Sequence, residues 1–235
     1  MLAESPFYEA YPGHRTWAVW YHVEIKKVVY DLKIDVLLSI PAMCPGKGKA
    51  EVKIEVLKTN VVIRREVEAD FDRVCEVVRL AFEGAEHTNH DEQNLVVRLR
   101  KSVAFVPGLS LVAETDGGEI LGHILFTRAV IRDGGHEHET LTLAPVAVVP
   151  EYQGKGIGGL LIEEGHRIAR KLGFKSVLLV GHPAYYPRFG YSGAETFSIT
   201  TDLELPPDVF MACELVEGGL ESVHGRVEFA PEFNL

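Results

Sequence analysis

The sequence is poor in cysteine, and its few cysteines lie far apart. The 235 residues include three cysteines, Cys44, Cys75 and Cys213, with no Cys-x-x-Cys pair among them. An odd number of widely spaced cysteines argues against a disulfide framework and against a thiolate zinc site. The sequence therefore predicts a protein of the reducing cytoplasm.

Basic residues and long apolar runs are also scarce. The chain has 24 Lys and Arg against 34 Asp and Glu, which gives a formal net charge of -10 at pH 7. Because a nucleic-acid surface needs clustered Lys and Arg, we expect no nucleic-acid partner. The longest apolar stretch, near residues 36–40, falls far short of the roughly 20 residues that cross a bilayer. We predict no membrane helix and no export signal.

The composition changes near residue 60. Residues 1–60 carry nearly balanced charges, whereas residues 61–235 are strongly acidic. We therefore divide the chain into an N-terminal extension, 1–60, and one main domain, 61–235. Three roles remain open for the extension: a lid on the substrate side, a contact that forms a homodimer, or no function.

Apolar periodicity predicts a mixed fold for residues 61–235. A strand starts at Val61, and an amphipathic helix follows from Asp70. A second helix is expected at 91–101, and antiparallel strands are expected at 109–113, 120–130 and 140–149. One strand-helix-strand crossover spans 146–179, and late strands are expected in TFSITT and VHGRVEF. The expected fold class is α/β (α+β), a mixed and mostly antiparallel twisted sheet with helices on both faces.

A glycine-rich turn lies between a buried strand and a helix. The β-branched run that starts at Val146 ends at Pro150, and a helix with apolar spacing begins at Ile157. The turn QGKGIGG between them leaves backbone N–H groups accessible at the positive end of the helix dipole. We expect this turn to bind an anion, such as a pyrophosphate.

Two nucleotide motifs fit this turn poorly. In a Walker A loop the lysine is followed by Ser or Thr, but here Lys155 is followed by Gly156. The dinucleotide pattern Gly154, Gly156 and Gly159 is present, yet the next strand, SVLLVGHP, contains no acidic residue. Only one strand-helix-strand unit follows residue 143, so the sheet of a dinucleotide fold is missing as well.

The third interpretation is a resemblance to the GNAT acetyltransferase superfamily. It depends on the Gln-x-x-Gly-x-Gly pattern after an apolar strand, followed by a helix, a strand and a Tyr-x-x-x-Gly-Tyr turn within GHPAYYPRFGY. The resemblance implies acetyl-CoA as co-substrate. The residues that it implies for acetyl-CoA binding are Val146, Ala147, Val148, Gln153, Gly154, Lys155, Gly156, Ile157 and Gly158.

The same resemblance implies catalytic residues. Tyr186 stands four residues before Gly190, the position from which family members protonate the departing thiolate, whereas Tyr185 is expected to pack. Glu139 is the candidate general base, and deprotonation of the amine through water is the alternative.

The predicted activity is transfer of an acetyl group from acetyl-CoA directly to a primary amine of a small molecule or protein. A non-catalytic acyl-CoA-binding sensor is the alternative function. His136 and His138 have strand-like spacing beside a turn, with no third ligand nearby in the sequence, so we expect no metal.

Overall fold

The computed structural model describes residues 60–85 and 88–234 in full, and the backbone of strands within residues 1–60. Contacts divide the chain into two compact units, Met1–Asn60 and Val61–Leu235. The first unit is a four-stranded antiparallel sheet in the order β1-β2-β3-β4. Its strands are β1 (Tyr8–Glu9), β2 (Thr16–Lys27), β3 (Tyr30–Pro41) and β4 (Ile54–Val56). The role of this extension stays a prediction.

The second unit is built on a nine-stranded sheet. Its strands are β5 (Val61–Arg65), β6 (Phe105–Thr115), β7 (Ile120–Asp133), β8 (His136–Val148), β9 (Ser176–Val180), β10 (Ser192–Gly193), β11 (Ile199–Thr200), β12 (Phe210–Glu214) and β13 (Gly225–Glu228). Strands β5 to β8 pair antiparallel in sequence order, and β8 pairs with β9 in parallel. β12 continues the sheet beside β9, while β13 pairs with the far end of β7.

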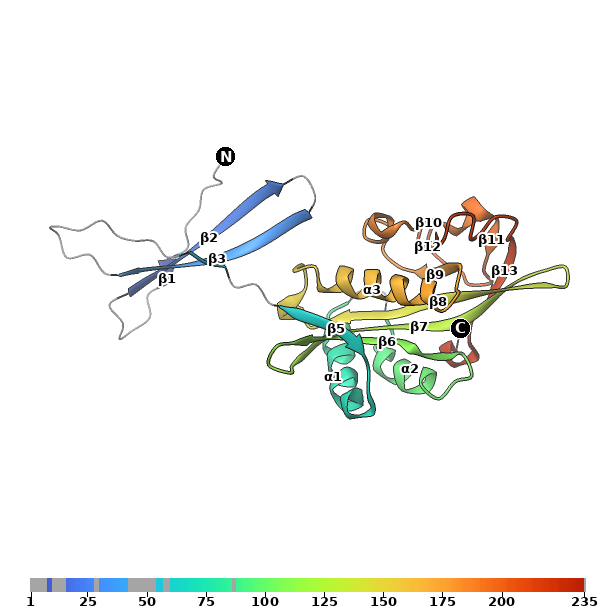
Figure 1. Cartoon of the computed structure of the whole chain (residues 1–235), viewed down its shortest axis with the longest axis horizontal. Helices are drawn as coiled ribbons and strands as arrows, with labels where there is room; N and C mark the ends of the chain where they lie inside the picture. Colours follow the sequence, from blue (N-terminus) through green and yellow to red (C-terminus); the bar gives the residue numbers. More distant parts are fainter. Residues whose placement is uncertain are drawn as a thin grey trace. The chain divides into compact units, whose positions relative to one another are not determined.

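Helices cover both faces of this sheet (Figure 1). α1 (Phe71–Phe82) and α2 (Glu92–Leu99) lie on one face, and α3 (Ile157–Lys171) lies on the other. Short 3-10 turns are η1 (Glu68–Asp70), η2 (Pro150–Tyr152), η3 (Tyr186–Phe189), η4 (Ala194–Phe197) and η5 (Pro231–Phe233). The predicted mixed, mostly antiparallel sheet with helices on both faces is confirmed. Among the described residues, no helix is long and apolar enough to cross a membrane.

Strand β7 forms the centre of the core because its side chains alternate between the two helical layers. Phe126 is fully buried, and its ring lies 6.2 Å from that of His166 on α3. The next residue toward the N-terminus, Leu125, belongs to a separate cluster with Leu99 of α2. Even-numbered residues of β7 in this stretch thus face α3, and odd-numbered residues face α1 and α2.

Strands β8 and β9 pair over a short distance. Their register joins Leu141 to Val177 and Thr142 to Leu178. A β-bulge follows in β8, because Leu143 and Val146 oppose Phe126 and Ile124, which leaves one extra residue on β8. Beyond Thr142, the edge of β8 that faces β9 has no strand partner in the described chain, although its other edge stays paired with β7. Backbone groups on that free edge are available to a ligand.

One expected strand is shorter than predicted. In the alternating segment TFSITT, Thr196 and Phe197 end the turn η4, and only Ile199–Thr200 forms a strand, β11. The segment that extends the sheet beside β9 is instead Phe210–Glu214, which forms β12. Alternation over so few residues is a weak signal, and pairing with the edge of β9 decided which segment became a strand.

Candidate functional site

The loop between β8 and α3 has the conformation that glycine permits. Gly154 and Gly156 have φ angles of 74° and 87°, in the left-handed region that L side chains rarely adopt. Gly156 is the N-cap of α3, and the helix begins at Ile157. The side chain of Gln153 donates a hydrogen bond from Nε2 to the carbonyl oxygen of Val148, at 2.9 Å. Gln153 therefore closes the loop back onto the end of β8.

Within residues 60–85 and 88–234, the first backbone N–H groups of α3 have no protein acceptor. The first helical hydrogen bond near this end runs from the Leu160 N–H to the Gly156 carbonyl, at 3.1 Å. In the described chain, no acceptor is recorded for the N–H groups of residues 154–159. These donors lie where the helix dipole places partial positive charge, so the loop can bind an anion.

Position 158 favours glycine because the Tyr185 hydroxyl lies where a Cβ atom would need space. A Cβ added at Gly158 would lie 2.8 Å from the Tyr185 hydroxyl oxygen. The Tyr185 ring also packs on Tyr186 and Phe189, with centroid distances of 5.0 and 5.4 Å. Tyr185 thus packs, as expected, and its hydroxyl lies against the first turn of α3.

Tyr186 is the first residue of η3, and its ring reaches back to Gly181, the residue that follows β9. Its ring packs so closely on Gly181 that an added Cβ there would be 2.3 Å from Cε2. Continuing the register of β8 and β9 places Gly181 level with Pro145, at the bulge. The Tyr186 side chain is 8% exposed, and burial raises the pKa of its hydroxyl well above the ordinary value. The hydroxyl therefore keeps its proton at neutral pH.

A buried histidine supports the tyrosine cluster from α3. His166 Nε2 lies 2.8 Å from the hydroxyl oxygen of Tyr191, and the Tyr191 ring lies 5.7 Å from that of Tyr186. Burial lowers the pKa of His166 to about 4 and raises that of Tyr191 well above its usual range. His166 was not among the residues predicted from the sequence, although its place among Ile162, Gly165 and Ala169 on the buried side of α3 was a usable signal.

A polar network lies buried on the opposite face of the sheet. Glu66 accepts hydrogen bonds from Arg100 and from Ser110 Oγ, the latter at 2.5 Å. His123 Nε2 lies 3.1 Å from the same Ser110 oxygen. Because the Ser110 proton goes to Glu66, Ser110 accepts from His123, which assigns the His123 proton to Nε2. Burial, with Arg100 nearby, lowers the pKa of His123 to about 3.

Both buried histidines should make stability depend on pH. The unfolded chain takes up a proton at each histidine near pH 6.5, but the folded protein does so only near pH 3 at His123 and pH 4 at His166. Unfolding therefore binds protons in this range, and stability falls as the pH drops below about 6.5. We expect each histidine to lower the free energy of unfolding by about 1 to 2 kcal/mol between pH 7 and pH 5.

Urea unfolding at the two pH values measures this loss. Single His123→Gln and His166→Gln variants should each have a smaller difference between pH 7 and pH 5 than the native protein. His136→Gln, at the exposed start of β8, is the matched control and should keep the full difference. An unchanged difference in both buried-site variants would show that other groups cause the pH dependence.

The structure does not bring Glu139 to this site. Glu139 pairs with Val130 of β7, on the far side of the Leu141 and Thr142 pairs from the bulge. Its side chain is 60% exposed and forms an ion pair with Arg128, with Nε and Oε1 3.1 Å apart. From Glu139 to Val146 is about 23 Å along an extended strand. We therefore do not propose Glu139 as the general base.

The remaining predicted binding residues lie around the loop. Val146, Ala147 and Val148 form the end of β8, and Ile157 is buried at the start of α3. The Lys155 ammonium lies over the ring of Tyr152, 4.8 Å from its centroid. The described residues contain no group of three or more His, Cys, Asp and Glu side chains that could hold a metal ion.

Comparisons with known proteins agree with this geometry. The model of the acetyltransferase (GNAT) family matches residues 71–191. The uncharacterized N-acetyltransferase YjhQ of Escherichia coli K12 is 44% identical over 100 residues, a match that covers 43% of this chain and 55% of YjhQ. The uncharacterized N-acetyltransferase YhbS of Escherichia coli K12 is 29% identical over 174 residues, 74% of this chain and 99% of YhbS.

Solved structures show the same similarity. The structure of YhbS from Escherichia coli in complex with CoA has a TM-score of 0.68 and 28% identity, covering 76% of this chain and 94% of YhbS. A GNAT family acetyltransferase from Brucella melitensis in complex with acetyl-CoA has a TM-score of 0.61 and 32% identity, covering 75% of this chain and 99% of that protein. The match with YjhQ, by contrast, spans about half of that relative's length.

Proposed function

Because this chain belongs to the GNAT acetyltransferase family, we propose that it transfers an acetyl group from acetyl-CoA directly to a primary amine of a small molecule or protein. The observation that carries the proposal is the row of N–H groups at the start of α3 that have no acceptor among the described residues, next to the edge of β8 that has no strand partner among them. A pyrophosphate needs the first feature, and an extended pantetheine arm needs the second.

In this proposal the predicted binding residues act in groups. Backbone N–H groups in the range 154–158 bind the pyrophosphate, while Gln153 holds the loop onto β8. The free edge of residues 146–148 pairs with the pantetheine arm, and N–H groups near the bulge polarise the thioester carbonyl. Acetyl-CoA supplies the activated acetyl group.

The amine reacts in its neutral form. Its nitrogen forms a bond to the acetyl carbon while the carbon–sulfur bond breaks, and one proton leaves the nitrogen. Tyr186 donates its hydroxyl proton to the departing thiolate and then recovers a proton from solvent. Glu139 is the one carboxylate among the predicted site residues, and it lies away from the bulge. We therefore assign the proton from the amine to water.

Calorimetric titration with CoA, run beside a thiol-release assay with acetyl-CoA and a panel of amines and peptides, tests the function. We expect saturable CoA binding and release of thiol that depends on the amine. Absence of CoA binding would overturn the proposed function, whereas binding without turnover on every acceptor would favour a sensor.

Gly158→Ala tests the proposed phosphate loop. The new methyl group would lie 2.8 Å from the Tyr185 hydroxyl, so Tyr185 or the first turn of α3 must move. We expect the dissociation constant for CoA to rise about tenfold or more, with little loss of folding stability. Calorimetry with CoA measures the effect.

Gly159→Ala is the matched control, because its added Cβ meets the Phe189 ring at 3.4 Å, an ordinary contact. The Gly158→Ala/Tyr185→Phe double variant removes the clashing oxygen and should recover part of the affinity. Equal CoA affinity in the native protein and Gly158→Ala would place the pyrophosphate elsewhere.

A further inference from the structure

A buried hydrogen bond ties the middle of α3 to the turn that carries Tyr186. His166 of α3 and Tyr191, which follows the turn η3, are 6% and 3% exposed. His166 Nε2 lies 2.8 Å from the Tyr191 hydroxyl oxygen. No other acceptor for this hydroxyl is recorded in the described chain, so the hydroxyl donates to Nε2 and the imidazole proton lies on Nδ1. The bond joins two segments that are 25 residues apart in the sequence.

The core holds each end of this hydrogen bond in place. Position 165 has no room for a side chain, because the Phe126 ring of β7 lies 2.3 Å from where a Cβ atom would be. This contact sets the height of α3 above the sheet at the level of His166. At the other end, Gly190 has a φ of 90°, and the Cys213 sulfur of β12 lies 3.4 Å from the place of its Cβ. The chain is thus packed on β12 directly before Tyr191.

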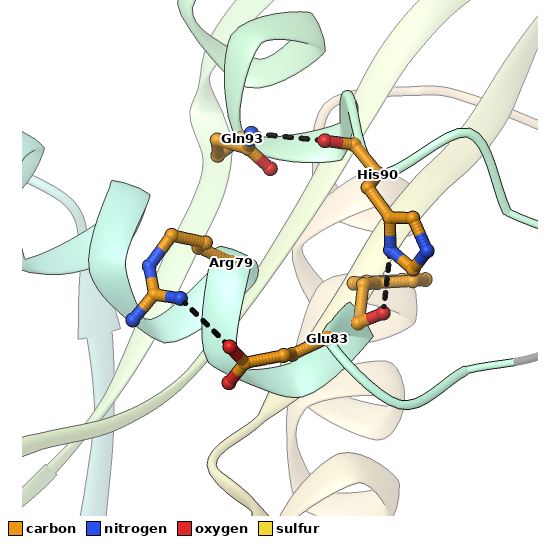
Figure 2. A pocket seen from close by; sticks show the side chains of 5 residues that line it. Arg79, Glu83, His90 and Gln93 are labelled. Carbon is orange, nitrogen blue, oxygen red and sulfur yellow. Dashed lines mark hydrogen bonds and ion pairs between the residues drawn. The ribbon is translucent and has the colours of Figure 1, made fainter.

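An exposed histidine shows why burial matters here. His90 Nδ1 lies 3.1 Å from the carbonyl oxygen of Phe82, beside a hollow of about 300 Å³ (Figure 2). Water can replace either partner of that contact, so it restrains the chain little. Breaking the bond between His166 and Tyr191 would instead leave a buried donor without an acceptor, which costs more free energy.

The Tyr191 ring is one of three surfaces that enclose the Tyr186 ring. Tyr191 and Tyr185 both meet it in T-shaped geometry, at centroid distances of 5.7 and 5.0 Å, and the backbone after β9 forms the third surface. Both flanking rings reach α3, Tyr185 at Gly158 and Tyr191 at His166. These two positions are about 12 Å apart along the helix. One helix therefore holds the turn of the acid at two points.

We propose that His166 and Tyr191 are positioning residues for the acid: their hydrogen bond fixes the Tyr191 ring, which holds the Tyr186 hydroxyl toward the departing sulfur. This inference rests on the proposed acetyl transfer. An apolar pair at the same place would limit the separation of α3 and the turn, whereas a hydrogen bond also fixes the tilt of the Tyr191 ring. Because proton transfer needs hydrogen-bond distance, a small displacement of the Tyr186 ring is enough to slow the reaction.

Tyr191→Phe removes only the hydroxyl oxygen and tests the inference by activity. We expect kcat to fall about tenfold, with the dissociation constant of CoA and the KM of the amine nearly unchanged. His166→Leu removes the acceptor and should cause a similar loss, whereas His166→Gln places an amide oxygen near the Nε2 position and should recover most of the activity. Added to Tyr186→Phe, the Tyr191→Phe substitution should lower kcat no further, because the group that it positions is absent.

Thr140→Val is the matched control. It removes a buried hydrogen bond of 2.7 Å to Ser176, on the side of the β8 and β9 pairing away from the bulge, and should lower stability without changing kcat. A second measurement needs no turnover, because NMR of carbon-13-labelled tyrosine gives the flip rate of the Tyr186 ring. We expect Tyr191→Phe and His166→Leu to raise this rate about tenfold or more, and Thr140→Val to leave it unchanged.

A flip rate that stays the same in Tyr191→Phe and His166→Leu would overturn the inference, and so would an unchanged kcat in Tyr191→Phe. An equal loss of kcat with Tyr186 present and with Tyr186→Phe would mean that the hydrogen bond supports the fold in general, which also overturns it. If the protein binds CoA but acetylates no acceptor, the proposed function fails. The flip rate then decides by itself whether His166 and Tyr191 hold Tyr186.

Discussion

Replacing Tyr186 with phenylalanine should lower kcat about 10²-fold or more while leaving the dissociation constant of CoA nearly unchanged. The substitution removes the hydroxyl that donates to the departing thiolate but keeps the ring that packs on Gly181 and Tyr191. Because burial raises the pKa of this hydroxyl, the native enzyme should keep its acid protonated across the neutral range. Steady-state thiol release and CoA calorimetry measure the two quantities.

Tyr185→Phe is the matched control for this experiment. Tyr185 is adjacent and also aromatic, but its hydroxyl lies against Gly158 at the start of α3 rather than on Gly181. Its removal should change kcat by no more than about twofold, because packing of the ring is kept. If Tyr186→Phe turned over as fast as the native enzyme, the proton of the thiol would have to come from another group or from water.

Replacing Glu66 with alanine should cost about 3 to 5 kcal/mol of the free energy of unfolding. The Glu66 and Arg100 side chains are 2% and 7% exposed, so the substitution leaves a guanidinium buried without its carboxylate. It also removes the acceptor of the Ser110 hydroxyl, and with it the hydrogen bond that orients His123. Urea unfolding at pH 7 measures the loss.

Glu76→Ala is the control for the ion pair itself. Glu76 forms a salt bridge with Arg79 at 3.0 Å, but both side chains are 45% exposed on α1. Water screens such a pair, so its removal should leave the urea midpoint almost unchanged. A similar small effect for Glu66→Ala would mean that Arg100 finds solvent or another acceptor, and that the network contributes little.

The order of elements could be predicted because each one carries its own local pattern. The apolar positions of α1 repeat at helical spacing, and Val74, Val77 and Val78 are buried as that spacing requires. Gly-rich turns likewise marked the hairpins on either side of β7. The C-terminal strands were less predictable, because segments of a few residues fit a strand or a turn equally well until a neighbour pairs with them.

Candidate residues near each other in the sequence could be named in the same way. Tyr186 and the glycine loop each belong to one contiguous segment, so spacing within the segment located them. Glu139 showed the limit of this reasoning, because a β-bulge and a short parallel pairing determine which part of β8 faces the open edge. No local sequence pattern shows at which residue of β8 the pairing with β9 ends.

The sequence by itself determined the glycine loop at the start of α3, the helix and strand on either side of it, and a tyrosine at the spacing of a proton donor. These features depend on residues a few positions apart, whose conformations are restricted by local sterics and hydrogen bonding. Only the tertiary structure decided that Glu66, Ser110 and His123 form one buried network, and that Arg98 of α2 donates to the backbone carbonyl of Glu232 near the C-terminus. Such contacts join distant segments. They form because packing the core excludes water, so the buried polar groups must find their hydrogen-bond partners within the protein.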